Sequence, residues 1–186
     1  PGYGFGQPLG GSGGQMAIDS DRLVNGAPER YNWKLVGKKE RFIPANVYKL
    51  HGKNVKYADL LKPGVPNPDY FRWELRRVWV VEGTLKEGFR HLYGRRVMYQ
   101  DEDTGMAVMA DFYDARGSLW QYAFLNYYYA FDIKAWQAGN AFYFDLNSGG
   151  YVGYNLFQER DKGPILNKGN LNASMFTPEA ARNAGN

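Results

Sequence analysis

The chain has 186 residues, a formal net charge of +4, 44% hydrophobic residues and 17% aromatic residues, and it contains no cysteine. This length and apolar content supply one domain with one hydrophobic core, which argues against disorder of the whole chain. The lack of cysteine excludes disulfides, thiol nucleophiles and thiolate metal sites. The modest positive charge permits contact with nucleic acid or anionic lipid without requiring it.

Glycine dominates the start of the chain. Seven of the first fourteen residues are glycine, and ordering such a backbone costs much conformational entropy. We therefore expect residues 1–18 to form a flexible segment. Residues 19–68 follow as irregular sequence, with short extended pieces at 31–36 and 41–47 and a helical turn at 57–61 that ends at a proline and a glycine.

A long β-strand is the clearest element of the sequence. In residues 72–82, Trp73, Leu75, Trp79 and Val81 fall on one side at a period of two, and most charged residues fall on the other. Turns rich in Asp and Gly separate the strands that follow, and their shortness makes neighbouring strands antiparallel. These further strands are expected at residues 90–93, 95–100, 106–113, 118–129, 141–146 and 151–157.

The C-terminal residues carry the signals of a helix start. Thr177 is suited to cap the helix, Pro178 to take its first position, and Glu179 to interact with the positive end of its dipole. We therefore divide the chain into three parts. They are a Gly-rich flexible segment at 1–18, an antiparallel β domain at 19–176, and a short C-terminal helix and tail at 177–186.

Few residues have the spacing of a catalytic or metal site. His51 in an expected loop and His91 in an expected strand lack the neighbouring histidine or carboxylate that a zinc site or an acid–base pair needs. Asp101 and Asp103 resemble the start of a calcium loop, but the position that needs a bidentate glutamate holds Phe112. We therefore expect no metal, no cofactor and no enzymatic activity.

Arginines and aromatic residues are interleaved on strands that should be adjacent. Such a surface can stack single-stranded nucleic acid, but the aromatic signature of RNA-binding sheets is absent and acids are mixed in, so we expect no nucleic-acid partner. Two interpretations stay open: a solvated face with cross-strand Arg–Glu pairs, or an amphipathic wall that meets acyl chains and anionic headgroups. The residues concerned are Arg72, Arg76, Arg77, Arg90, Arg95, Arg96, Trp73, Trp79, Tyr93 and Tyr99.

Several phrases of the sequence are together specific for one family. They are WKLVGKKE, RVWVVE, RHLYGRR and DFYDARGSLW. The stretch that contains them resembles a bacterial family of unknown function, number thirteen twenty-nine of the domains of unknown function, which is often labelled outer-membrane lipoprotein-sorting-like. The resemblance runs from about residue 19 to the C-terminus. Family members are longer, so the chain is similar to their C-terminal half.

The resemblance implies a fold and a cellular setting. The fold of the family resembles the lipoprotein carriers LolA and LolB, in which a curved antiparallel sheet forms a half-barrel covered by helices. We therefore expect a mainly β half-barrel with a few short helices, incomplete in this fragment, with the N-terminal half of its own parent chain as a partner. The family accompanies resistance-nodulation-division exporters and outer-membrane proteins, and its signal peptide implies the periplasm. The present chain begins at Pro1 without a signal peptide, as a processed or truncated chain would.

Our leading hypothesis is periplasmic binding or transfer of a lipid or other hydrophobic small molecule, in association with envelope export. The expected apolar wall consists of Trp73, Trp79, Tyr99, Trp120, Tyr122 and Phe124. The expected contacts to an anionic headgroup are Arg76, Arg77, Arg95 and Arg96.

The alternative hypothesis is a scaffold that binds no ligand and docks on an exporter or an outer-membrane protein. Residues 122–131 form a continuous apolar run, which predicts a strand that is covered on both faces or that meets a partner. The three consecutive tyrosines at 127–129 within this run favour the docking hypothesis.

Overall fold

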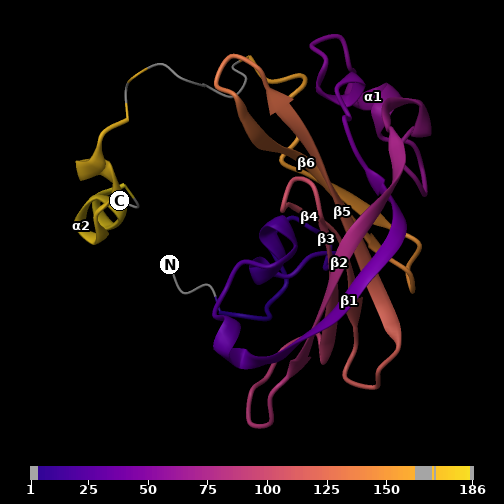
Figure 1. Ribbon diagram of the computed structural model, residues 1–186, viewed down its shortest axis with the longest axis vertical. Helices are drawn as coiled ribbons and strands as arrows, with labels where there is room; N and C mark the ends of the chain where they lie inside the picture. Colours follow the sequence, from indigo (N-terminus) through magenta and orange to yellow (C-terminus); the bar gives the residue numbers. More distant parts are fainter. Residues whose placement is uncertain (1–3, 162–168, 170, 185–186) are drawn as a thin grey trace.

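One antiparallel β-sheet forms the body of the protein. The structure, a computed structural model, describes residues 4–161, 169 and 171–184. Seven strands follow one another in the sheet in sequence order, so each pairs only with its neighbours in the chain (Figure 1). The strands are β1 (Tyr31–Pro44), β2 (Trp73–Leu85), β3 (Arg95–Asp101), β4 (Ala107–Tyr113), β5 (Leu119–Ala130), β6 (Ala135–Asp145) and β7 (Tyr151–Tyr154). The sheet is open, with β1 and β7 at its edges.

The helices are short and lie outside the sheet. Two are α-helical, α1 (Tyr57–Leu60) and α2 (Pro178–Asn183), and the Thr177 hydroxyl caps α2 by accepting the Ala180 N–H at 3.1 Å. The 3₁₀ turns are η1 (Ile18–Leu23), η2 (Pro28–Arg30), η3 (Lys49–His51), η4 (Pro68–Tyr70) and η5 (Ala173–Phe176). The predicted fold class, a curved antiparallel sheet with a few short helices, is confirmed. Among the described residues, no helix has the length and apolar character needed to cross a membrane.

Three strand predictions need correction. The two extended pieces expected within residues 31–47 are one strand, β1, because Gly37 at φ +127° absorbs a β-bulge that interrupts the sequence pattern but not the pairing. Residues 90–93 form a loop rather than a strand, and they turn Tyr93 into the core. Strand β6 begins at Ala135, well before the expected position 141. A bulge between Ala138 and Ala141 interrupts the alternation of apolar and polar residues in this strand and so hides its first part.

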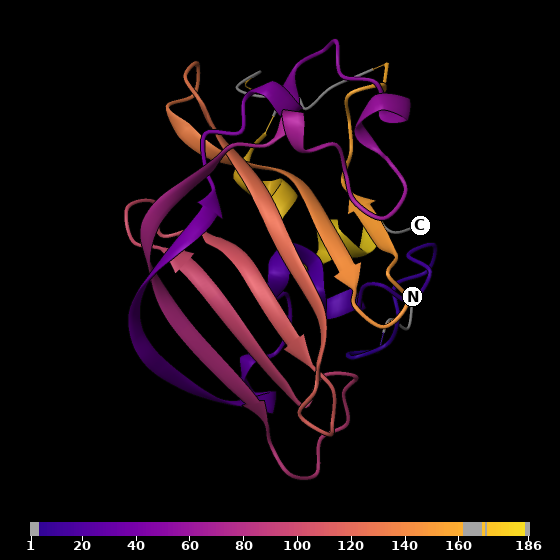
Figure 2. The ribbon, with the colours of Figure 1, turned by 90° about the vertical axis from the view of Figure 1, so that its right-hand side faces the viewer.

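The glycine-rich start of the chain packs on the sheet, so the expectation of a flexible segment is wrong for its described part. Met16 and Leu23 are fully buried against Phe112 and Tyr143 in one core cluster. Burial of these side chains offsets the entropy lost by the glycines. We call residues 4–26 the N-terminal segment and the sheet face beneath it the N-terminal face. Figure 2 shows the segment behind the strands.

The other face of the sheet is covered at one end by the connection between β1 and β2. Val47 and Leu60 from this connection pack on Phe124 of β5 and Phe142 of β6. Phe124 is followed by Leu125, which belongs to the N-terminal face. Strand β5 is therefore covered on both faces, as its continuous apolar run predicted.

The sheet curves strongly where β2 begins. Residues 73–77 pair with β1 alone, because the pairing of β2 with β3 starts only at Val78. A two-stranded ribbon twists more than a full sheet. This end of the ribbon therefore approaches β4 and β5, and Ile43, Val78 and Val108 are buried together there.

Candidate functional site

A continuous group of aromatic rings lies on the face opposite the N-terminal segment, and we call it the aromatic wall. The ring centroids of Phe71 and Trp73 lie 5.5 and 5.2 Å from that of Phe124. Phe124 lies 5.6 Å from Phe144, which stacks on Tyr122 at 4.4 Å. The wall consists of Phe71, Trp73, Tyr122, Phe124, Phe142, Phe144 and Tyr151.

The aromatic wall has a buried floor and an open rim. Phe124 and Phe144 are each 5% exposed, whereas Trp73 is 42% exposed and Tyr122 and Tyr151 are half-buried. Burial raises the pKa of the Tyr122 and Tyr151 hydroxyls above the ordinary value of 10, which keeps them neutral. The rim therefore presents ring surface with uncharged polar tips, which suits contact with an apolar molecule.

Only part of the predicted apolar wall comes together. Trp73, Tyr122 and Phe124 belong to the aromatic wall, and Tyr99 lies beside it, in register with Met109, which in turn pairs with Phe124. The Tyr99 hydroxyl donates to Asp111 at 2.7 Å, and burial together with this carboxylate raises its pKa. Tyr99 therefore sits at the polar border of the wall.

Trp79 and Trp120 lie on the other side of the sheet. Trp79 precedes Val80, the residue that pairs with Tyr99, so alternation directs the two side chains to opposite faces. Lys38 lies over the Trp79 ring, 4.5 Å from its centroid. Trp120 packs against the N-terminal face and donates its indole N–H to Asp145 at 2.8 Å. Trp73 and Trp79 are six residues apart in β2, so regular alternation predicts the same face for both side chains. We attribute their different positions to the twist of the two-stranded ribbon.

The predicted headgroup arginines are paired with acids of the protein. Arg76 contacts Glu74 at 2.7 Å, Arg77 contacts Glu102 at 2.8 Å, and Arg95 contacts Glu82 at 3.0 Å while its guanidinium covers the Tyr113 ring. Arg76 and Glu74 lie on the same strand, whereas Arg76 with Asp101, at 3.3 Å, and Arg95 with Glu82 follow the pattern of cross-strand pairs. The prediction of a headgroup contact is wrong for Arg96, because its side chain is fully buried and cannot reach a headgroup.

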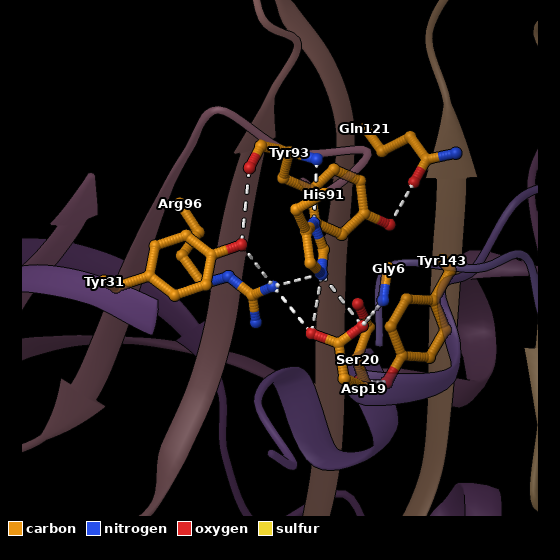
Figure 3. Close-up of polar contacts among 9 residues, drawn as sticks. All are labelled: Gly6, Asp19, Ser20, Tyr31, His91, Tyr93, Arg96, Gln121 and Tyr143. Atoms are coloured by element: carbon orange, nitrogen blue, oxygen red, sulfur yellow. Dashed lines mark hydrogen bonds and ion pairs between the residues drawn. The ribbon is translucent and has the colours of Figure 1, made fainter. Parts of the chain in front are cut away.

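Arg96 instead belongs to a buried polar cluster that ties the N-terminal segment to the sheet, which we call the clasp (Figure 3). Its guanidinium donates to Asp19 and to the Tyr31 hydroxyl, each at 3.0 Å. His91 Nε2 donates to the Asp19 carboxylate at 2.7 Å, while its Nδ1 accepts the Tyr93 N–H. Three separate parts of the chain therefore meet at one carboxylate.

The clasp extends through further hydrogen bonds around the core. The Gly6 N–H donates to Asp19 at 3.0 Å, and a Cβ at position 6 would lie 2.9 Å from the His91 backbone, so only glycine fits. The Tyr93 hydroxyl donates to Gln121 at 2.6 Å, and burial raises the pKa of Tyr93 to about 12. The Tyr143 hydroxyl donates to the Ser20 carbonyl at 2.6 Å. Figure 3 shows these groups turned toward one another.

The central side chains of the clasp are shielded from solvent. Asp19 is 6% exposed, and the His91 side chain is fully buried. No three His, Cys, Asp or Glu side chains gather as a metal site in the described part of the chain. Sequence reasoning missed the acid beside His91 because Asp19 lies 72 residues away in the chain.

Three known proteins are similar to this chain. An uncharacterized protein of Pseudomonas aeruginosa is 42% identical over 173 residues, which cover 92% of this chain and 38% of that protein. A putative outer membrane lipoprotein-sorting protein domain from Vibrio parahaemolyticus is 18% identical with a TM-score of 0.48, over 80% of this chain and 47% of that one. A LolA superfamily protein from Nitrosomonas europaea is 14% identical with a TM-score of 0.49, over 80% and 50%.

The present chain thus spans less than half the length of its curated relative. The family described as protein of unknown function DUF1329 matches residues 1–182, which is nearly all of the sequence and includes the N-terminal segment. The chain belongs to the DUF1329 family.

Proposed function

We propose that this chain is a periplasmic module that binds or transfers a lipid or other hydrophobic molecule, with the aromatic wall as its ligand surface. The observation that carries the proposal is the open rim over a buried aromatic floor, where Trp73 is 42% exposed. An exposed tryptophan beside half-buried aromatic rings offers a surface for an apolar ligand. Association with envelope export belongs to the same proposal.

We also propose that the module is not an enzyme. The buried charged groups are engaged within the protein: Asp19 pairs with Arg96, and Asp101 pairs with Arg76. His51 is neutral near physiological pH, because burial lowers its pKa to about 4. Binding of a ligand without a catalysed reaction requires only the aromatic wall and access of the ligand to it.

Lipid retention tests the proposal. The protein is expressed in a bacterial periplasm, purified without detergent and extracted with organic solvent, and the extract is analysed by mass spectrometry. We expect a stoichiometric apolar compound that is lost in Trp73→Ala. Trp79→Ala is the matched control, since the same residue type in the same strand lies away from the wall.

Two results would count against lipid binding. One is a folded, monodisperse wild-type protein that carries no compound and binds no apolar fluorescent probe. The other is equal retention by Trp73→Ala and the wild type. The first result would move the function to the scaffold hypothesis, and the second would remove the aromatic wall as the ligand surface.

The scaffold hypothesis has one structural observation in its favour. Phe131, at the turn between β5 and β6, is 73% exposed and stands next to Tyr48 and Tyr129, with ring centroids 6.1 and 5.2 Å away. An exposed aromatic tip is a typical anchor for a protein partner. Capture of an exporter or outer-membrane protein that is lost in Phe131→Ser would favour docking.

A further inference from the structure

A groove runs along the open edge of the sheet at β7, apart from the residues predicted as the ligand wall. It has a volume of about 560 Å³, which lies in the range of ligand sites. Leu9, Tyr57 and Leu156 line it together with residues 152–155 of the edge strand and residues 10–12 of the N-terminal segment. The N-terminal segment and the β1–β2 connection thus form the two sides of one groove.

The groove is apolar and wide because of particular residues. Leu9, Val152 and Leu156 supply aliphatic surface, and each also packs against a core cluster. Gly10 and Gly11 contribute no side chains, and a Cβ added at Gly10 would meet no atom within 4 Å. The glycines therefore leave space along the groove that larger residues would fill.

One positively charged residue lines the groove. Arg160 lines the groove and also a neighbouring cavity of about 490 Å³, to which Lys53 and Asp161 contribute. Arg160 is the only charged residue that lines the groove in the described part of the chain. The adjacent Glu159 is engaged by Lys56 at 3.3 Å and by the Tyr57 N–H at 2.8 Å, so its charge is already balanced.

We propose that this groove binds the acyl chain of an anionic amphiphile and that Arg160, assisted by Lys53, binds its anionic end. An apolar groove that is lined by a guanidinium complements a chain with a terminal carboxylate or phosphate. Arg160 and Lys53 form no ion pair with another described residue, so both are available for this contact. The inference rests on the proposed function and adds a second site, separate from the aromatic wall, that defines the chemical class of the ligand.

Two fluorescent probes separate the apolar contact from the ionic one. One is a long-chain fatty acid with conjugated double bonds, and the other is its methyl ester. We expect the wild-type protein to bind the carboxylate at least tenfold more tightly than the ester, and Arg160→Gln to remove this preference. Arg116→Gln, a change at an exposed arginine outside the groove, should retain it.

Filling the groove tests its location. Gly10→Trp introduces a large side chain where the structure has open space, so it should weaken the binding of both probes at least tenfold and leave thermal unfolding unchanged. Equal affinities for the two probes in the wild type, or undiminished binding by Gly10→Trp, would overturn the inference. Binding that is then lost only in Trp73→Ala would sustain the proposed function at the aromatic wall, whereas no binding of either probe would overturn both.

Discussion

Asp19 stabilises the fold only while its carboxyl is charged. Burial alone would raise its pKa, but the hydrogen bond from His91, the charge of Arg96 and the Gly6 N–H outweigh burial and hold the pKa well below 3.8. Since the folded pKa is depressed, this stabilisation is complete above the unfolded value of 3.8 and is lost progressively as the pH falls below that value toward the folded pKa.

We therefore predict that Asp19→Asn lowers the free energy of unfolding by about 3–5 kcal/mol at neutral pH, because Arg96 loses its buried partner. Urea unfolding at a series of pH values measures the difference, which should shrink in acid. Asp103→Asn is the control, because that carboxylate is 74% exposed. An undiminished difference in acid would show that charge is not what Asp19 contributes.

His51 provides a second test at the scale of a single residue. Its ring stacks with Phe157 and contacts Tyr128, its Nδ1 donates to the Val47 carbonyl at 2.7 Å, and burial lowers its pKa from 6.5 to about 4. Stability linked to His51 is present above pH 6.5 and is lost toward pH 4, by about 3 kcal/mol. We predict that NMR titration places one histidine near pH 4 and that this resonance disappears in His51→Phe. A titration near 6.5 would contradict the buried position.

At the scale of one element, the bulge of β6 depends on Gly139. A Cβ at this position would lie 1.9 Å from His51 Nε2 and 2.7 Å from the Asn126 carbonyl oxygen. We predict that Gly139→Ala lowers the free energy of unfolding by about 1–3 kcal/mol, as overpacking does. Gly10→Ala is the matched control and should change stability little, because its Cβ meets open space. Equal effects of the two variants in chemical denaturation would contradict this account.

The N-terminal segment is the element whose packing differs most from its sequence prediction, and its methionine tests that packing. Met16 is 1% exposed, whereas Met175 in η5 is 49% exposed. We predict that Met16→Ala costs about 2–5 kcal/mol in urea unfolding and that Met175→Ala costs almost nothing. A small effect at Met16 would mean that the segment is not part of the cooperative core.

At the scale of the whole molecule, the open edge at β1 combines exposed apolar residues with protective charges. Phe42 and Leu75 are cross-strand partners, 64% and 57% exposed. The bulge at Gly37 and the charged run at residues 38–41 are features that oppose edge-to-edge pairing. The edge is therefore protected along its middle and apolar near its end.

We predict that Phe42→Lys reduces self-association at high concentration, as measured by sedimentation, and changes stability by less than about 0.5 kcal/mol. Leu146→Lys replaces an apolar residue of similar exposure in the β6–β7 turn and serves as the control. If both variants self-associate like the wild type, the Phe42–Leu75 pair is not an adhesive surface.

The sequence by itself determined most of the antiparallel strands, their turns and the C-terminal cap at Thr177, because alternation, turn chemistry and capping act over a few residues. It also placed Trp73, Tyr122 and Phe124 among the residues of one wall. It could not separate Trp79 and Trp120 from them, since the choice of face follows from ribbon twist and bulges. Only the tertiary structure decided the packing of the N-terminal segment and the clasp of Asp19, His91 and Arg96. Those contacts join residues far apart in the chain, and no local pattern encodes a contact whose stability depends on burial by the rest of the fold.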